Sequence, residues 1–311
     1  MSRPAPPSRA AGRFPVKVLY AGSAPFAVLV LRYLMLSGHR VVGCLTTPDR
    51  PRGRHGSPQP SPLKEEALSA GLPVSQPASW RGAEVVAEVL SLAPDVLVAC
   101  AYGMIVPPAL FDRLDSLVVH PSAVPRWRGA APVERALMAG ETELAVTTLK
   151  MTEGVDEGPV ADLRAVTVPR DSDAGRAYEL LAGPAAEGLV DTLDRVASGS
   201  VMWQPQVGEP TYAAKLTEGD RIMDWARPAQ ALADQVRALA PGIGAVTELG
   251  GRRALIWAAR ALPVAPPAAS DRLVLPCGAG CLEVLEVQEA GRRRMTTAEY
   301  LRGAGRRLVD R

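Results

Sequence analysis

The feature that most constrains the fold is a series of short apolar runs, separated by stretches with helical spacing, in the first two thirds of the chain. Residues 16–21 (VKVLYA) and 94–100 (PDVLVAC) are apolar without regular polar alternation. Strands of this kind are buried on both faces, as in a parallel sheet covered by helices. Between them, residues 26–37 repeat apolar side chains at the spacing of one helix face. The pattern predicts an α/β fold with a parallel-rich sheet.

The alternation of strands and helices stops near Ser198. Residues 198–210 are rich in Gly, Pro and Gln, which predicts a linker. Beyond it, one helix at residues 229–239 and several short strands indicate a small β-barrel or half-barrel. We therefore expect four parts: a disordered tail at 1–15, an α/β domain at 16–197, a linker at 198–210 and a small OB-like β-barrel domain at 211–311.

Composition argues against several classes of protein. The net charge is +2, from 35 basic and 33 acidic residues, so no strong electrostatic field is expected. No run reaches the ~18 apolar residues of a membrane helix, and we expect a cytoplasmic chain with no membrane partner. Residues 1–14 lack the apolar core of a secretory signal. Their three arginines and absence of acids faintly resemble a transit peptide, but a frayed tail is the favoured interpretation.

The four cysteines predict no redox or metal chemistry. Cys44 and Cys100 lie in predicted buried strands, where thiols are usually inert. Cys277 and Cys281 flank two glycines, a spacing that leaves a metal or a disulfide open without favouring either. The set as a whole fits a reducing compartment, and we expect no metal site.

One histidine stands where an α/β sheet binds its ligands. His120 ends the predicted strand at residues 116–120, and ligands bind at the carboxyl ends of such strands. Asp156 lies in a Gly-flanked turn after a later strand, so the two side chains could meet above the sheet. Asp156 would then orient the imidazole while His120 relays a proton. From spacing alone, a purely structural role for His120 stays open. The opening βαβ unit has only Gly22 of a dinucleotide fingerprint, which argues against NAD.

Two segments carry clustered arginines. Residues 48–62 contain five prolines and the cations Arg50, Arg52 and Arg54, so they predict a long surface loop. Loops of this length are functional or disordered, which leaves a mobile insertion or a loop that closes on a phosphate-bearing partner. The run from Arg292 to Arg294 is either a solvated face or a patch that binds a nucleic-acid backbone.

Blocks along the chain resemble the methionyl-tRNA formyltransferase family. HPSAVPRWRGAAP followed by LKMTEGVDEGPV is similar to the family pattern NVHxSLLPRWRGAAP and then MxxGLDTGP. GSAPFAVLVL, TTPDRPRGRHGSPQPSPLK and AYGMIVP resemble further blocks in the same order. In the second domain, YAAKLTEGDRIMDW and QEAGRRRM resemble YAxKLTxEExxIDW and QxxGKKxM. The resemblance implies a Rossmann-like formyltransferase catalytic domain followed by a tRNA-binding β-barrel domain.

The resemblance also implies an activity and a set of site residues. The activity is transfer of a formyl group from 10-formyltetrahydrofolate to the amine of methionyl initiator tRNA, for translation initiation, and we expect a monomer. His120 and Asp156 are implied to be catalytic. The implied folate-binding residues are Ser122, Ala123, Val124, Pro125, Tyr102, Gly103 and Ile105. The implied tRNA-binding residues are Arg50, Arg52, Arg54, Arg292, Arg293 and Arg294.

One departure from the family pattern bears directly on the chemistry. The family's catalytic Asn, two residues before the histidine, is Val118 in this chain. An Asn carboxamide donates a hydrogen bond to a developing oxyanion, whereas Val has no donor. Loss of one such donor typically lowers kcat by ~10²–10³. We therefore expect weak activity or none, unless water or the hydroxyl of Ser116 or Ser122 substitutes. The alternatives are a non-catalytic descendant that binds folate or tRNA, and a formyltransferase acting on another amine.

Overall fold

The computed structural model describes residues 15–51, 56–80, 83–267, 269 and 271–303. These residues form two compact units. The first unit comprises residues up to 130, residues 145–166 and residues 179–212, and the second comprises residues 131–144, residues 167–178 and residues from 213 onward. The predicted tail at residues 1–14, together with Arg52 and Arg54, lies outside the described residues. The predicted domain limits stay a prediction, because a compact unit and a sequence domain need not coincide.

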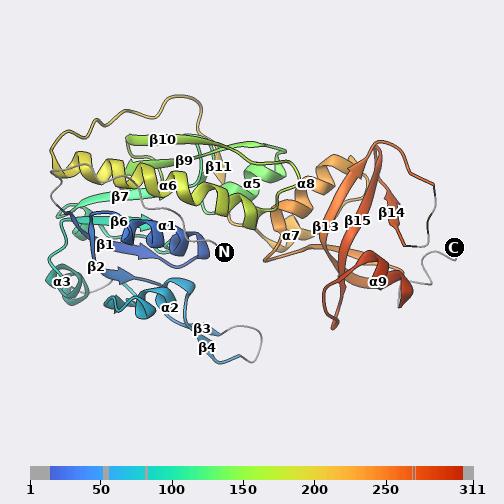
Figure 1. Cartoon of the computed structure of the whole chain (residues 1–311), viewed down its shortest axis with the longest axis horizontal. Helices are drawn as coiled ribbons and strands as arrows, with labels where there is room; N and C mark the ends of the chain where they lie inside the picture. Colours follow the sequence, from blue (N-terminus) through green and yellow to red (C-terminus); the bar gives the residue numbers. More distant parts are fainter. Residues whose placement is uncertain (1–14, 52–55, 81–82, 268, 270, 304–311) are drawn as a thin grey trace. The chain divides into compact units, whose positions relative to one another are not determined.

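A seven-stranded sheet forms the centre of the first unit, with the order β10-β9-β7-β6-β1-β2-β5 (Figure 1). Its strands are β1 (Lys17–Gly22), β2 (Arg40–Leu45), β5 (Val74–Ser75), β6 (Val96–Cys100), β7 (Asp115–His120), β9 (Glu143–Lys150) and β10 (Val160–Thr167). The pairs β1–β2, β1–β6, β2–β5 and β6–β7 are parallel, and β9 runs antiparallel to β7. The predicted parallel-rich α/β sheet is therefore confirmed.

Both faces of this sheet are covered, as the apolar runs predict. On one face, Leu19 of β1 belongs to a buried cluster that includes Val86 and Val89 of α3 (Ala83–Ser91). On the other face, Tyr20 donates its hydroxyl hydrogen to the carbonyl of Ala27 in α1 (Pro25–Met35), at 2.9 Å. The helices α2 (Pro62–Ser69), α4 (Pro108–Phe111) and α6 (Ala174–Ala197) complete the helices that contribute to this unit. Every residue of β6 is buried.

The long helix α6 begins at Ala174, and Asp173 caps it by accepting the backbone N–H of Arg176 at 2.8 Å. The predicted surface loop at residues 48–62 contains a short exposed hairpin, in which β3 (Arg50–Pro51) pairs with β4 (Pro58–Gln59). Pattern analysis missed the hairpin because each strand has only two residues and proline disfavours strands.

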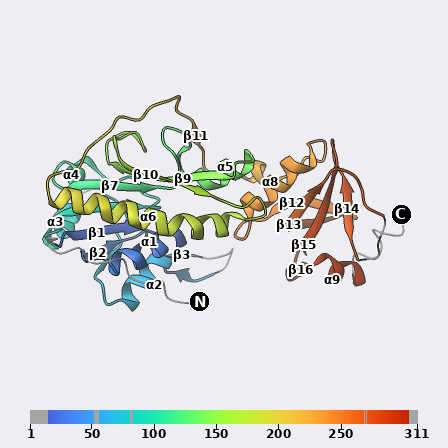
Figure 2. The same cartoon turned by 45° about the horizontal axis from the view of Figure 1, so that its top comes forward.

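The second unit is built on a five-stranded antiparallel sheet, which confirms the predicted small β fold as a half-barrel. Its strands lie in the order β12-β13-β15-β14, with β16 paired to β15 (Figure 2). They are β12 (Ala245–Leu249), β13 (Arg252–Leu262), β14 (Leu273–Pro276), β15 (Cys281–Glu289) and β16 (Met295–Thr296). Helix α8 (Ala229–Leu239) presents Leu232 and Val236 to the sheet's core, which includes Ile256 and Val284. The remaining helices of this unit are α5 (Pro132–Met138), α7 (Glu218–Arg221) and α9 (Thr297–Arg302).

The four cysteines behave as buried or half-buried thiols. All four are free. Cys44 and Cys100 are buried in β2 and β6, and burial raises the pKa of each thiol to about 12. The expected burial of these two thiols is confirmed, and a raised pKa disfavours the thiolate, which is the reactive form.

Candidate functional site

His120 is the last residue of β7 and lies at the carboxyl end of the sheet's parallel strands. Its side chain is buried, and each ring nitrogen faces an oxygen. Nε2 lies 2.8 Å from the carbonyl oxygen of Trp127, and Nδ1 lies 3.3 Å from Oδ2 of Asp156. The structure therefore brings the two predicted catalytic residues together.

The pair has the geometry of a proton relay. A carbonyl oxygen only accepts, so the contact with Trp127 requires a hydrogen on Nε2 of His120. At the other nitrogen, a hydrogen bond to Asp156 requires one proton on Nδ1 or on the carboxylate. A proton placed between an imidazole and a carboxylate can be taken from, or delivered to, a reacting group.

Asp156 is presented by a tight turn between β9 and β10. Its φ is +56°, in the left-handed region that aspartate enters more readily than most residues. Its Oδ2 also accepts the backbone N–H of Gly129 at 2.9 Å. Gly129 has a φ of +106°, which disfavours any side chain there. The carboxylate is thus held between a backbone donor and the imidazole.

Val118 stands two residues before His120 on β7, so both side chains lie on the same face of the sheet. It is half-buried and pairs with Ala99 on one side and Leu149 on the other. It offers no hydrogen-bond donor at the position where the family pattern has Asn.

The two hydroxyls that could have replaced the missing amide are already engaged. Ser116 donates to the carbonyl oxygen of Leu114 at 3.0 Å, and Ser122 donates to that of Arg126 at 2.7 Å. Either would have to break an internal hydrogen bond before stabilising an oxyanion.

The predicted folate residues fall into two loops with different exposure. In the loop after His120, Ser122, Val124 and Pro125 are buried and Ala123 is half-buried. The carbonyl of Ser122 accepts the hydroxyl of Thr147 at 2.6 Å, which ties this loop to β9.

In the loop after β6, Gly103 and Ile105 are exposed, with Ile105 at 79%. The Tyr102 side chain instead packs in the apolar cluster with Leu19 and Leu97, and burial raises its pKa. The backbone carbonyl of Tyr102 accepts the Ser23 hydroxyl at 3.0 Å.

The three consecutive arginines of the second unit all have acidic partners. Arg292 pairs with Glu289 at 3.2 Å, Arg293 with Glu299 at 3.1 Å, and Arg294 with Glu286. The Arg294 guanidinium also lies 5.1 Å from the ring centroid of Trp257. The positive charge of this segment is therefore partly compensated. Among the predicted tRNA residues of the first unit, Arg50 is described, and it is exposed.

Sequence analysis missed a strap, residues 206–211, which runs beside the His120 loop. Thr211 accepts the backbone N–H of Trp127 on its hydroxyl at 2.8 Å and donates its own N–H to Pro125 at 3.0 Å. Gln206 contacts Arg128 and the turn of Asp156. Gly, Pro and Gln composition predicts a linker, and it carries no signal for side chains that fix neighbouring loops.

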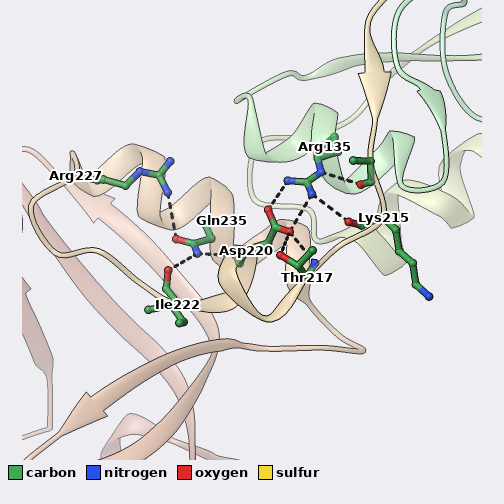
Figure 3. Close-up of polar contacts among 8 residues, drawn as sticks. Arg135, Lys215, Thr217, Asp220, Ile222, Arg227 and Gln235 are labelled. Atoms are coloured by element: carbon green, nitrogen blue, oxygen red, sulfur yellow. Dashed lines mark hydrogen bonds and ion pairs between the residues drawn. The ribbon is translucent and has the colours of Figure 1, made fainter.

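A second polar cluster, also missed, lies in the second unit (Figure 3). Arg135 of α5 holds both carboxylate oxygens of Asp220, with Nη2 at 2.9 Å from Oδ2, and Nε donates to the carbonyl of Ala214 at 3.1 Å. Thr217 donates its N–H to the same carboxylate at 2.7 Å. The Arg135 guanidinium is the main reason that the pKa of Asp220 falls to about 2. The side chain of Lys215 points away from this cluster (Figure 3).

Two absences apply to the described part of the chain. It contains no group of three His, Cys, Asp or Glu side chains that could hold a metal ion. Within the same residues, no helix is both long and apolar enough to cross a bilayer.

Comparison with known proteins matches both parts of the chain. The formyl transferase family profile matches residues 16–193, and the profile of the formyl transferase C-terminal domain matches residues 215–305. Methionyl-tRNA formyltransferase from Symbiobacterium thermophilum is 42% identical over 303 residues, which cover 93% of each chain.

Two solved structures share the fold. One is methionyl-tRNA formyltransferase from Clostridium thermocellum, with a TM-score of 0.55 and 15% identity over 79% of this chain and 93% of that one. The other is HypX from Aquifex aeolicus in complex with tetrahydrofolic acid, with a TM-score of 0.63 and 18% identity over 92% of this chain and 47% of that one.

Proposed function

Because this chain belongs to the methionyl-tRNA formyltransferase family, we propose that it transfers the formyl group of 10-formyltetrahydrofolate to the amine of methionyl initiator tRNA. The observation that carries the proposal is the His120–Asp156 contact of 3.3 Å at the carboxyl edge of the sheet. The likeness to methionyl-tRNA formyltransferases over 93% of the chain selects this reaction among those a His–Asp pair can serve.

The reaction needs one proton to move from the attacking amine to the leaving nitrogen. The amine nitrogen forms a bond with the formyl carbon, and the bond from that carbon to N10 of the folate breaks. The tetrahedral intermediate between these events carries an oxyanion. The His120–Asp156 pair takes the proton that the amine loses and returns it to N10, so no net charge builds up in the buried site.

Different segments of the chain would contact the folate and the tRNA. The segment from Ser122 to Pro125 and the exposed backbone at Gly103 line the folate side, with Ile105 offering an apolar surface. Arg50 and the arginines of the second unit would contact the tRNA backbone. Since Arg292, Arg293 and Arg294 all have glutamate partners, their contribution would be smaller than that of unpaired cations.

Val118 sets the rate that this site can reach. With no amide at this position, and with the Ser116 and Ser122 hydroxyls bonded to carbonyls, the oxyanion lacks an amide or hydroxyl donor from these three residues. A missing donor of this kind typically lowers kcat by ~10²–10³. The chain is therefore proposed to be a slow formyltransferase.

The same observation favours a second candidate, a descendant that binds folate or tRNA without turnover. Purified protein is incubated with 10-formyltetrahydrofolate and charged initiator tRNA under single-turnover conditions, beside His120→Ala. Slow accumulation of formylmethionyl-tRNA that depends on His120 supports the enzyme. Folate or tRNA binding without product, at any enzyme concentration, supports the descendant.

A third arm tests the acceptor. A nucleotide-linked amino sugar replaces the tRNA in the same assay. Formylation of the sugar but not of the tRNA would overturn the proposed substrate while leaving the reaction type intact.

A further inference from the structure

Gln206 bridges the two segments that hold the catalytic carboxylate. Its Nε2 donates to the carbonyl oxygens of Asp156 and Gly158, both at 2.8 Å. Its Oε1 accepts from Arg128, at 3.1 Å from Nε and 2.7 Å from Nη2. All four residues belong to the first unit.

The two hydrogen bonds from Nε2 of Gln206 fix the backbone of the turn that carries Asp156. Asp156 has a positive φ, a conformation of higher energy for a residue with a Cβ that persists only where its surroundings enforce it. Two hydrogen bonds from one amide group to carbonyls two residues apart hold the turn in this shape. The turn is also tight at Gly158, where a Cβ would lie 1.8 Å from the carbonyl oxygen of Lys150.

The second set of contacts fixes the donor that faces the carboxylate. Arg128 directly precedes Gly129, whose N–H donates to Oδ2 of Asp156 at 2.9 Å. Arg128 also pairs with Glu157, the residue after Asp156, at 3.1 Å. The Gln206 amide therefore fixes the position of the Asp156 backbone. Through Arg128, it also fixes the position of Gly129, whose N–H donates to the Asp156 carboxylate.

Only an amide of this length satisfies all four contacts. The NH₂ group supplies two donors to two carbonyls, while the oxygen accepts from the guanidinium. A glutamate would place an oxygen against the two carbonyls, and a leucine would leave both carbonyls and the guanidinium without this partner. The chemistry of the contacts thus requires glutamine.

We infer that Gln206 is a positioning residue for the formyl transfer, acting through Asp156 to hold its carboxylate against Nδ1 of His120. This inference rests on the proposed function, and it goes beyond it by assigning a catalytic consequence to a residue of the strap. A displacement of about 1 Å in a reacting group is enough to lower a rate by ~10²-fold. Gln206→Leu should therefore lower kcat by ~10–100-fold with the KM for tRNA and for folate nearly unchanged.

A double-mutant cycle separates positioning from a general structural effect. The single-turnover rate is measured for wild type, Gln206→Leu, Asp156→Asn and the double variant. If Gln206 acts through Asp156, the Gln206 substitution should lower the rate less than about twofold further once the carboxylate is gone, since coupled residues are not additive. A full ~10–100-fold loss in both backgrounds would overturn the inference. Gln204→Leu is the matched control, because Gln204 is exposed and, among the residues that the structure describes, hydrogen-bonds through its backbone to Val160, and its rate should equal that of wild type.

A second measurement is independent of turnover, so that a slow or inactive chain still tests the inference. The Gly129 amide proton donates to Asp156, and its NMR chemical shift reports the position of the carboxylate. Gln206→Leu should move this resonance in the same direction as Asp156→Asn does, while Gln204→Leu leaves it in place. An unmoved Gly129 resonance in Gln206→Leu contradicts the inference whether or not wild type formylates tRNA.

Discussion

Each unit contains a glutamine whose side-chain amide hydrogen-bonds to the backbone of an aspartate and to an arginine. The two arrangements differ in the groups that face the carboxylate of the aspartate. Gln206 donates to the carbonyls of Asp156 and Gly158 and accepts from Arg128. Gln235 donates to the carbonyls of Asp220 and Ile222, at 2.8 and 3.0 Å, and accepts from Arg227 at 3.4 Å (Figure 3). Each amide fixes the backbone of the aspartate and of the residue two positions later.

The carboxylates of the two aspartates have different partners. Asp220 is held by both arms of Arg135 and by Thr217, so its charge is fully committed. Asp156 accepts one backbone N–H and faces the imidazole of His120, and within the described residues no arginine pairs with it. The same arrangement of a glutamine around an aspartate therefore accompanies a carboxylate paired with arginine in the second unit and a carboxylate that faces histidine in the first.

The largest expected effect is a loss of formylation rate on substitution of Asp156. Asp156→Asn should lower kcat by ~10²–10⁴, the range for loss of a general acid or base, because the amide cannot share a proton with His120. The single-turnover formylation rate checks this, with His120→Ala as the reference for complete loss of the pair. A variant that keeps more than a tenth of the wild-type rate would remove Asp156 from the proposed mechanism.

The next effect concerns stability and belongs to the second unit. Asp220→Asn should lower the free energy of unfolding by about 1–3 kcal/mol, since it removes hydrogen bonds to a charged group and leaves Arg135 without its anion. Urea denaturation at pH 7 measures the change. The formylation rate per folded molecule should stay within about twofold of wild type. A large fall in that rate without a fall in stability would contradict the division between the two clusters.

The same ion pair makes a prediction about pH. The pKa of Asp220 is about 2 in the folded chain, below its ordinary value of 3.8, so the carboxylate stabilises the fold above the higher value. This stabilisation is lost as the pH falls from about 4 to about 2. The difference in unfolding free energy between wild type and Asp220→Asn should therefore be constant between pH 5 and 7 and shrink below about pH 4. A difference that does not shrink on acidification would exclude the charge of Asp220 as its cause.

The smallest expected effect is on the free energy of unfolding and concerns an exposed ion pair of the second unit. Arg293 pairs with Glu299 at 3.1 Å, and its side chain is 75% exposed. Arg293→Ala should change the free energy of unfolding by less than about 1 kcal/mol, as is typical of exposed pairs. Thermal unfolding measures this change beside Asp220→Asn, and equal losses in the two variants would show that the Arg135 cluster has no special weight.

Much of the fold follows from the sequence because burial on both faces leaves a strong pattern. The run from Val96 to Cys100 is apolar throughout, and it forms the fully buried strand β6. His120 could be placed at the sheet's carboxyl edge for the same reason. His120 and Asp156 lie 36 positions apart in the sequence. The resemblance to a family predicts that the two side chains meet, and the structure gives the geometry of their contact.

The rest depends on contacts that local pattern does not record. Gln206 stands in a stretch whose composition indicates only a linker, and its role arises from two loops that the fold brings beside it. Asp171 and Asp173 are both good N-caps by residue type, and the position of the first helical turn decides between them. The sequence does not show that the Ser116 and Ser122 hydroxyls donate hydrogen bonds to carbonyl oxygens. These bonds bear on whether either hydroxyl can replace the donor that is missing at Val118.

The measurement that tests the account most directly is the single-turnover formylation rate of Val118→Asn beside wild type, with saturating 10-formyltetrahydrofolate and methionyl initiator tRNA. The two side chains proposed to move the proton are in contact, and the part proposed to be missing is the oxyanion donor. Restoring the amide should therefore raise the rate by ~10²–10³, and the gain should vanish when His120→Ala is added. Equal rates for wild type and Val118→Asn would contradict the claim that this position limits the reaction.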